Sequence, residues 1–249
     1  MALTPPSNPI GGQYTELKRI DSTNDFARTW SEQGEGMHGA VFFAWEQTAG
    51  RGQFGKSWHG ESGQNLAMSI LLKNQLLPDP TPFHLSACIA LCVNEVMASI
   101  TRGDTCIKWP NDLYWKSRKL GGLLIESGHT WTIVGIGLNI NQTQFPDSLP
   151  NPVSLKQITG KELDPKTLSL DIIRSLNQGF SNWEGTGFEP LFDTYQSQLF
   201  GKDESFQVRE QGIEKWIRIK DVTPDGGLRI EEDGNTRIVV SGLEWIIRP

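Results

Sequence analysis

Apolar and polar positions repeat along this chain in two ways, and each repeat predicts one kind of element. Apolar residues recur at steps of three and four over 83–100 and over 165–184, which predicts two amphipathic helices. A shorter helix is expected at 188–199, and Ser22 with Asp25 three positions later marks the start of another. Runs rich in β-branched, aromatic and aliphatic residues predict strands, at 40–46, 65–72, 105–109, 120–127 and 131–140.

The pattern changes near residue 203. Beyond it, short apolar runs alternate with turns rich in Gly and Asp. This spacing predicts a small β-barrel-like module, with strands at 204–209, 214–220, 228–232 and 236–240. The preceding body mixes strands and helices, so the expected fold class is α+β, with a mixed β-sheet flanked by helices. Residues 1–12 are rich in Pro, Gly and small polar side chains and are expected to be poorly ordered.

Residues 50–57 read GRGQFGKS and satisfy the phosphate-binding loop pattern GxxxxGK[ST]. In such a loop a helix starts at the Lys-Ser pair and its N-terminus holds the phosphates. Here two glycines and a predicted strand at 65–72 follow instead, so strand–loop–strand is expected. The run Leu123–Glu126 also ends in Glu where a second nucleotide motif would end in Asp. The loop still offers glycines and the charges of Arg51 and Lys56, which suit an anion.

Composition argues against several classes of protein. The net charge is −6 with a pI of about 5.3, and the positive residues form no long run, which argues against a nucleic-acid-binding surface. The three cysteines form no Cys-x-x-Cys pair, which suits a reducing cytoplasm. The four histidines lie far apart, without metal-ligand spacing. No apolar stretch of membrane-spanning length and no signal peptide are recognisable, so a cytoplasmic protein without a membrane partner is expected.

Five short motifs follow one another in the first part of the chain. They are Asp21–Asn24 (DSTN), Glu46–Gly52 (EQTAGRG), Lys108–Asp112 (KWPND), Arg118–Gly122 (RKLGG) and Gly135–Asn139 (GIGLN). In this order and spacing they resemble the biotin protein ligase family, also called the biotin–acetyl-CoA-carboxylase ligases. The resemblance covers nearly the whole chain. It implies a catalytic domain at 1–202 with a fold like that of class II aminoacyl-tRNA synthetases, and a C-terminal SH3-like domain at 203–249.

The resemblance implies a two-step reaction. Biotin and ATP give biotinyl-5′-AMP and pyrophosphate, and this mixed anhydride then acylates a lysine of a biotin carboxyl carrier domain. ATP and Mg²⁺ are thus the implied cofactors, and biotin, ATP and the carrier domain the implied partners. A biotin site should be mainly apolar with a few placed polar groups. The implied biotin-binding residues are Ser22, Thr23 and Gln47 at the ureido group, Trp58 and Leu124 as apolar walls, Gly135 and Gly137 as a flat surface, and Gly50, Arg51, Gly52, Lys119 and Gly122.

The activation step brings two anions together, because the biotin carboxylate attacks the α-phosphorus of ATP. Positioning and positive charge must therefore carry it. By resemblance, the catalytic residues are Lys119, as the central cation, and Arg51, which together with the amides of 50–52 clamps carboxylate and phosphate. Asp112 would bind Mg²⁺, which takes carboxylate and phosphate oxygens. The implied ATP-binding residues are Arg51, Lys56 (at the pyrophosphate), Trp58, Asn111 and Asn139 (at adenine) and Lys119.

Two loop positions depart from the pattern of the family. Gln53 and Lys56 stand where many members carry arginines. The loop is less cationic as a result, and Lys56 cannot make the bidentate contact of a guanidinium. The affinity for ATP or for the adenylate is therefore expected to differ. The aromatic residue that stacks on adenine in some members has no clear counterpart here, Phe145 being a weak candidate.

Other functions stay open at this point. A lipoate or octanoate protein ligase shares the general fold, and a non-catalytic biotin-binding regulator would keep the fold without turnover. Some bacterial members of the resembled family also bind DNA through an N-terminal winged helix-turn-helix. Only about twenty residues precede Asp21, so we expect a monofunctional ligase, a possible homodimer, without a nucleic-acid partner.

Overall fold

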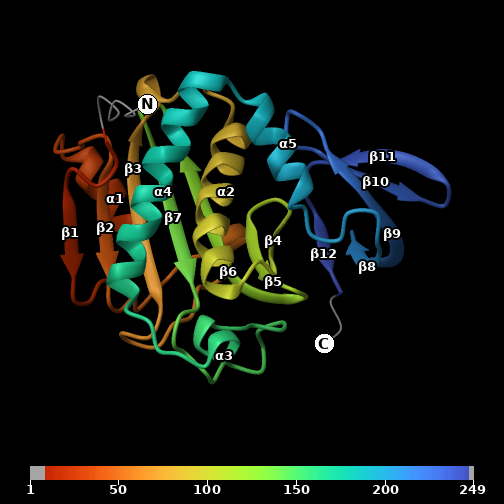
Figure 1. The fold of residues 1–249 in the computed structure, drawn as a ribbon, viewed down its shortest axis with the longest axis horizontal. Coiled ribbons are helices and arrows are strands. Elements are labelled where there is room, and N and C mark those ends of the chain that lie inside the picture. The colour runs from red at the N-terminus through yellow and green to blue at the C-terminus, as the bar shows by residue number, and fades with distance from the viewer. Residues whose placement is uncertain (1–8, 247–249) are drawn as a thin grey trace.

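The structure is a computed structural model and describes residues 9–246. Its strands form a seven-stranded sheet of order β1-β2-β3-β7-β6-β5-β4 and a five-stranded sheet of order β11-β10-β9-β8-β12 (Figure 1). In the larger sheet β1 pairs with β2 in parallel and the other neighbours are antiparallel, so this sheet is mixed. Its strands are β1 Tyr14–Leu17, β2 Ala40–Ala44, β3 Leu66–Lys73, β4 Thr105–Lys108, β5 Asp112–Trp115, β6 Arg118–Ser127 and β7 Trp131–Leu138.

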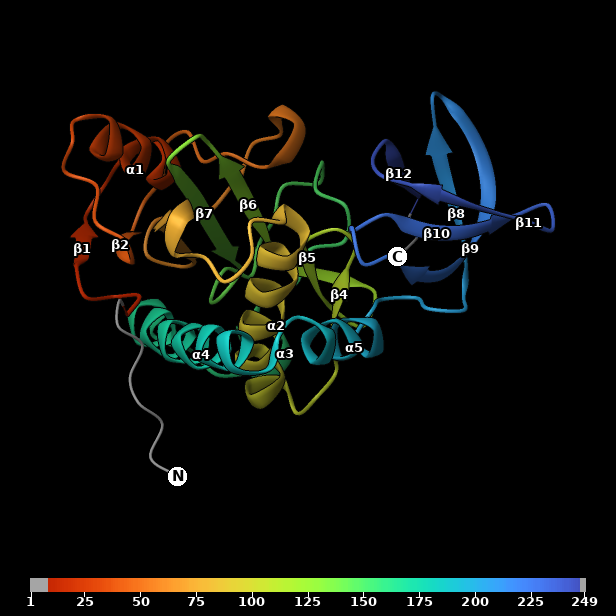
Figure 2. The ribbon, with the colours of Figure 1, turned by 90° about the horizontal axis from the view of Figure 1, so that it is seen from above.

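Helices cover both faces of the larger sheet. The α1 helix and the loop between β2 and β3 lie on one side, while α2, α4 and α5 lie on the other (Figure 2). We call the first side the α1 face. The α-helices are α1 Thr23–Glu32, α2 Pro82–Thr101, α3 Leu155–Thr159, α4 Pro165–Thr186 and α5 Glu189–Ser197, and the short 3-10 turns are η1 Gln53–Gly55 and η2 Asn74–Leu76.

Local sequence explains where these helices begin. The Ser22 side chain accepts a hydrogen bond from the Asp25 main-chain N–H and so caps α1, as the sequence predicts. Thr81 precedes α2, with Pro82 in the first turn, where a missing N–H costs nothing. Asp164 caps α4 by accepting hydrogen bonds from two main-chain N–H groups of the first turn.

The α2 helix corrects the expectation that no stretch reaches membrane-spanning length. Among the described residues, Pro82–Thr101 is long and apolar enough to cross a membrane by length and composition, and 56% of its most apolar window is buried inside the protein. It packs on the large sheet beside α4 and carries many of the buried residues of the core. Its apolar character is accounted for by this central position in the core.

Successive side chains along the central strands of the large sheet point alternately toward the core and toward the α1 face. Met68, Ile136 and Leu123 lie side by side on β3, β7 and β6 and belong to the core beneath α2 and α4. Their strand neighbours Ala67, Gly137 and Gly122 lie in one row on the α1 face. Successive side chains of a strand point to opposite faces, so the α1 face has small residues in this row. Nearer to α1 the same face carries large residues, Phe42, Leu71 and Ile133, which form a second buried cluster.

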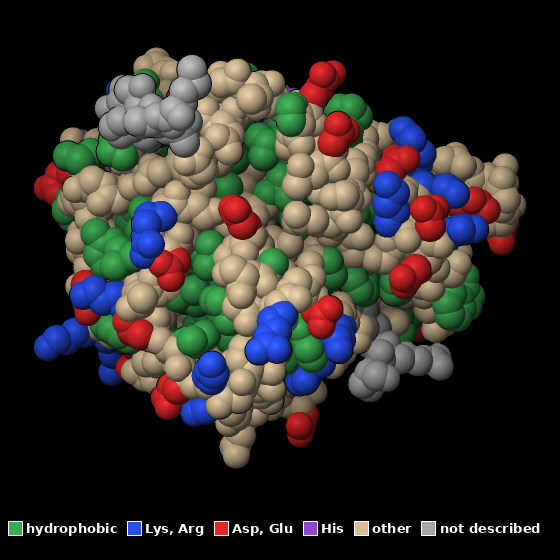
Figure 3. All heavy atoms as spheres, viewed as in Figure 1, with side chains coloured by type: hydrophobic (Ala, Val, Ile, Leu, Met, Phe, Trp, Pro, Cys, Tyr) green, Lys and Arg blue, Asp and Glu red, His purple; other side chains and the backbone are tan. Residues whose placement is uncertain are grey.

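The C-terminal strands form an open antiparallel sheet with β11 and β12 as its edges among the described residues. The four predicted strands are present, and a fifth, β12, was not predicted. The strands are β8 Ser205–Glu210, β9 Ile213–Val222, β10 Leu228–Glu232, β11 Asn235–Val239 and β12 Leu243–Trp245. Charged side chains of both signs gather over this sheet (Figure 3); one ion pair joins Arg229 to Asp221, at 2.9 Å.

The two sheets share one hydrophobic core. Val208, Ile219 and Ile230 of the C-terminal sheet belong to the same buried cluster as the residues beneath α2. At the junction, the Trp109 indole N–H donates to the Gly226 carbonyl at 2.9 Å. The Gln196 side chain bonds both the N–H and the carbonyl of Val222. The core therefore runs across the position near 203 where the sequence pattern changes.

Four elements escaped the sequence analysis. They are the strands β1, β5 and β12 and the helix α3, and all four are short. The expected poorly ordered segment 1–12 falls mostly outside the described residues, but Ile10 is buried and its main-chain N–H donates to Asn177. The strand–loop–strand prediction for 50–57 is confirmed, because β2 and β3 flank that loop and pair with each other.

Candidate functional site

A row of residues crosses the α1 face of the large sheet. From β3 to β4 the register aligns Ala67, Gly137, Gly122, Asp112 and Lys108. The first three are small, so the floor of this face is flat in the middle, and charged side chains stand at its β4 end. Such a face suits an elongated ligand with an apolar part and an anionic part.

A polar cluster lies where α1 meets the sheet. The Gln47 Oε1 atom accepts hydrogen bonds from the Thr23 N–H at 2.7 Å and from the Thr23 hydroxyl at 3.0 Å. The Ser69 hydroxyl lies 2.7 Å from the Thr23 hydroxyl and 2.6 Å from Asn24 Oδ1. Ser22 and Thr23 are both buried. These groups offer donors and acceptors beside an apolar floor.

Four charged residues form an ion network at the same end: Asp25, Arg28, Arg51 and Glu126. Asp25 Oδ1 lies 2.5 Å from Arg28 Nη1 and 2.5 Å from Arg51 Nη1. Glu126 Oε1 lies 2.8 Å from Arg28 Nη2 and 3.0 Å from Arg51 Nη2. Burial disfavours the charged form of Arg51, but the Glu126 and Asp25 carboxylates outweigh it and raise the pKa of Arg51. The network ties the 50–58 loop to α1 and β6.

The same loop places an indole on the sheet. A Cβ atom added to Gly137 would lie only 2.7 Å from the Trp58 ring, so Trp58 covers β7 at this point. A Cβ on Gly50 would meet the Trp58 carbonyl at 2.6 Å, and the Trp58 N–H donates to the Gly50 carbonyl at 2.8 Å. Gly50 and Gly137 thus let the loop and the indole approach closely. By contrast, Gly135 lies against Asn24, whose Oδ1 a Cβ would meet at 2.4 Å.

Lys119 and Asp112 form an ion pair on the α1 face. Lys119 Nζ donates to Asp112 Oδ1 at 2.7 Å, and both side chains are partly exposed. Gly122 lies directly beside them, since a Cβ there would meet Asp112 Oδ1 at 2.8 Å. A cation and a carboxylate are therefore placed next to the small floor of the sheet, where an anionic ligand would contact Lys119.

The two asparagines predicted at adenine are buried and bonded to main chain. Asn111 Nδ2 donates to the Leu123 carbonyl, and Asn139 Nδ2 donates to the Val153 carbonyl at 3.1 Å. In this structure their amides hold neighbouring strands and loops together. Lys56 is exposed on the loop, and Leu124 is half-buried on β6 beside Gly135.

Lys108 is a buried lysine at the β4 end of the row. Its side chain is enclosed by Tyr114, whose hydroxyl lies 3.3 Å from Nζ, and by the Trp245 ring, whose centroid lies 4.7 Å from Nζ. Burial lowers the pKa of Lys108 to about 8, with Asp112 opposing that shift and Lys119 adding to it.

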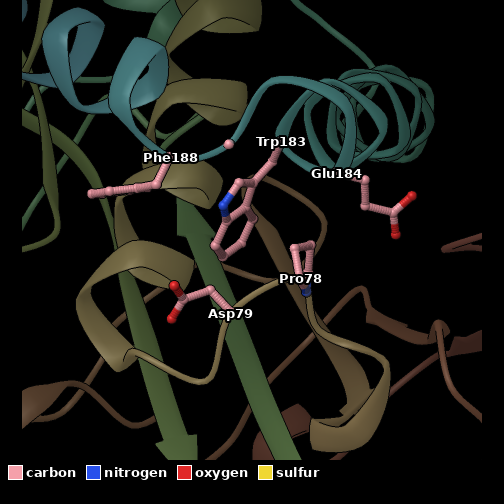
Figure 4. Close-up of a pocket in the computed structure, with 6 residues that line it drawn as sticks. Pro78, Asp79, Trp183, Glu184 and Phe188 are labelled. Atoms are coloured by element: carbon pink, nitrogen blue, oxygen red, sulfur yellow. The ribbon is translucent and has the colours of Figure 1, made fainter.

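A separate pocket of about 310 Å³ lies away from these residues, at the turn between α4 and α5. Figure 4 shows Trp183 from the last turns of α4 and Phe188 from the segment before α5, with Asp79 and Pro78 across from them. None of the predicted site residues lines it. Among the described residues, no group of three or more His, Cys, Asp or Glu side chains could hold a metal ion on its own.

The fold thus brings most of the predicted residues to one face. Ser22, Thr23 and Gln47 lie at its α1 end, and Asp112 with Lys119 near its β4 end. The sequence analysis missed other residues that complete these groups, which are Asn24, Asp25, Arg28, Ser69, Lys108 and Glu126. Asn24 and Lys108 stand inside quoted motifs, whereas the pairing of Glu126 with Arg51 depends on a contact between distant segments.

Comparison with known proteins decides the family. Residues 16–141 match the family model described as the biotin/lipoate A/B protein ligase family. The chain belongs to the biotin/lipoate A/B protein ligase family.

Individual ligases of this family resemble the chain over most of its length. It is 30% identical to the bifunctional ligase/repressor BirA of Escherichia coli, over 90% of this chain and 71% of that protein. It is 26% identical to the biotin–[acetyl-CoA-carboxylase] ligase of Mycobacterium tuberculosis, over 92% and 87% of the two chains. The biotin protein ligase of Aquifex aeolicus, solved with biotin and ATP, superposes with a TM-score of 0.82 at 27% identity, over 95% of this chain and 99% of that one.

Proposed function

We propose that this chain is an ATP-dependent biotin protein ligase. Family membership and the likeness to a ligase solved with biotin and ATP support this function. The observation that carries it is the α1 face, which joins the Thr23–Gln47 polar cluster, a floor of small residues and the Asp112–Lys119 pair. Biotin and ATP present matching parts in the same order: a ureido ring, an apolar ring and chain, a carboxylate and a polyphosphate.

The biotin half of the site lies at the α1 end. Thr23 and Gln47 supply the polar groups for the ureido ring, with Ser22 at the start of α1 beside them. Trp58 and Leu124 border the apolar part of the ligand. Gly122, Gly135 and Gly137 have no side chain that would project from the sheet toward it. Burial of the ligand's apolar surface provides affinity, and the few polar groups provide orientation.

Activation joins biotin to the α-phosphorus. A carboxylate oxygen forms the new P–O bond as the bond to the bridging oxygen of pyrophosphate breaks, and pyrophosphate leaves with that electron pair. Lys119 lies where it can contact both anions and reduce their repulsion. In the structure Asp25 and Glu126 hold the Arg51 guanidinium at the α1 end. For Gly50, Arg51 and Gly52 to clamp the carboxylate and the phosphate, the loop would have to move toward Lys119, and Lys56 would then reach the departing pyrophosphate. We call the β4 end of the α1 face the nucleotide end. Asn111 and Asn139 border it, and their hydrogen bonds to main-chain carbonyls fix its shape.

Asp112 is the carboxylate suited to Mg²⁺ in this site. Because the described residues hold no cluster of three acidic or histidine side chains, the remaining ligands would be phosphate oxygens and water, as is usual for this ion. Bound there, Mg²⁺ would neutralise phosphate charge. Asp112 has one oxygen bonded to Lys119, which orients its carboxylate.

The second step transfers biotin to protein. The ε-amine of a lysine on a biotin carboxyl carrier domain attacks the carbonyl of biotinyl-5′-AMP, an amide bond forms, and AMP leaves. The C-terminal sheet, which we propose to be a small SH3-like domain at 203–249 beside a catalytic domain at 1–202, borders the nucleotide end through Trp245 and Lys108.

Pyrophosphate exchange tests this function. The chain should incorporate labelled pyrophosphate into ATP only when biotin is present, because the adenylation step is reversible. Lipoate and octanoate in place of biotin serve as comparators. Exchange with lipoate or octanoate but not with biotin would assign the related ligase activity instead, and biotin binding without exchange would indicate a non-catalytic regulator.

A further inference from the structure

Lys108 is a buried lysine to which the two reaction steps assign no role. Its side chain is only 8% exposed, and no carboxylate of the described residues lies within ion-pair distance of its ammonium. A buried ammonium without a paired carboxylate is costly, because burial removes its hydration. Its one hydrogen bond among the described residues is to the Tyr114 hydroxyl, at 3.3 Å.

The surroundings hold this ammonium in a fixed place. Nζ lies 5.0 Å from the centre of the Tyr114 ring and 4.7 Å from the centre of the Trp245 ring. Tyr114 comes from β5 and Trp245 from β12 of the C-terminal sheet, where Trp245 packs on Phe206 with ring centres 5.3 Å apart. Aromatic faces attract cations, so the two rings offset part of the lost hydration.

The position of Lys108 places its charge beside the nucleotide end. Lys108 lies directly across from Asp112 in the β4–β5 register, on the α1 face. The charges of Lys119 and Lys56 act on its ammonium together with that of Asp112, and of these only Lys119 is paired with the Asp112 carboxylate. This local excess of positive charge contrasts with the net charge of −6 of the whole chain, and a polyphosphate would balance it.

We propose that Lys108 is a positioning residue for the phosphate chain of ATP, fixed by Tyr114 and Trp245 so that its charge acts beside the Asp112–Lys119 pair. This rests on the proposed ligase function. It also makes the C-terminal sheet part of the nucleotide half of the site, since one wall around the ammonium is Trp245.

Kinetics of biotin-dependent pyrophosphate exchange test the proposal. Lys108→Met keeps the length and packing of the side chain and removes its charge. We expect it to raise the KM for ATP about tenfold, as loss of a nearby charge in a partly buried site should, and to leave the KM for biotin within about twofold. Lys108→Arg, which keeps the charge, should recover most of the ATP affinity. Lys116→Met is the matched control, because Lys116 also lies over an aromatic ring, Trp115 at 4.6 Å, but is largely exposed.

The outcomes separate the possible roles. An unchanged KM for ATP in Lys108→Met, or equal rises for ATP and biotin, would overturn the proposal and leave Lys108 a structural residue. So would an arginine variant that behaves like the methionine variant. If Lys108→Met does not fold, Lys108→Gln carries the same comparison. Absence of biotin-dependent exchange in the unaltered chain would instead contradict the proposed function itself.

Discussion

Lys119 is the residue on which the activation step depends most directly. Replacing it with alanine should lower biotin-dependent pyrophosphate exchange about 100-fold, because a charge lost from the stabilisation of a transition state costs ~3 kcal/mol. The melting temperature should change little, since its ion pair with Asp112 is partly exposed. Lys156→Ala, which breaks a similar exposed pair with Glu162, is the control. Near-normal exchange in Lys119→Ala would remove Lys119 from the mechanism.

The ion network around Arg51 should control how long the adenylate stays bound. Glu126→Gln removes a carboxylate that contacts both Arg28 and Arg51. Since exposed ion pairs contribute up to about 1 kcal/mol, we expect biotinyl-5′-AMP to dissociate about fivefold faster. A filter assay of released adenylate measures this rate. Asp171→Asn, in an exposed pair with Arg174, should leave the rate unchanged; equal rates in both variants would contradict a role for the network.

The sequence alone identified the residues of the motifs, but it did not predict the contacts between distant segments of the chain. Ser22 was recognised as a helix cap because its partner Asp25 is three positions away. Arg51 was expected at a ligand, yet its guanidinium is held by Asp25 and Glu126, which lie 26 and 75 positions away. Charge pairs of that separation depend on the sheet register, and a single sequence does not contain that information.

Strands β6 and β7 illustrate how two neighbouring glycines can have different roles. A Cβ on Gly121 would lie 2.5 Å from the Gly137 carbonyl and 3.2 Å from the Leu138 Cα, so main chain would have to move. We expect Gly121→Ala to lower the free energy of unfolding by about 1–3 kcal/mol, measured by urea denaturation. An unchanged unfolding midpoint would show that the sheet adapts without cost.

Gly137→Ala should affect binding instead. Its Cβ would meet the Trp58 indole, a side chain that can move without disturbing the sheet. We therefore expect a biotin affinity several-fold weaker, measured by calorimetry, with a melting temperature close to that of the unaltered chain. Loss of stability without loss of affinity would assign Trp58 to packing alone.

At the scale of elements, the long helices and strands were predictable and the short ones were not. The α2 and α4 helices have apolar repeats long enough to be distinctive, whereas α3 and β5 span five and four residues. A run as short as β5 has no periodicity of its own. Its strand conformation comes from pairing with β4 and β6 on either side.

The whole molecule should unfold as one unit, because its core runs through both sheets. Gln196→Ala removes two hydrogen bonds to the main chain of Val222 at the junction. We expect it to lower the free energy of unfolding by about 1–3 kcal/mol, while heat denaturation stays a single transition. Two separate transitions in a calorimetric scan would show that the sheets fold independently.

The sequence suggested a boundary near residue 203. The first strand of the C-terminal sheet, β8, begins at Ser205, and the hydrophobic core continues across this position. What the sequence could not suggest is how the C-terminal sheet meets the body, because the contacts of Trp109 with Gly226 and of Lys108 with Trp245 join residues more than a hundred positions apart. Those contacts bring the C-terminal sheet to the nucleotide end of the α1 face.

Mass spectrometry of a biotin carboxyl carrier domain tests the central claim most directly. After incubation with the chain, biotin, ATP and Mg²⁺, the carrier should gain the mass of one biotin on a single lysine, and omission of ATP should abolish the gain. A carrier domain that stays unmodified, or that accepts lipoate in place of biotin, would contradict the assignment of this chain as a biotin protein ligase.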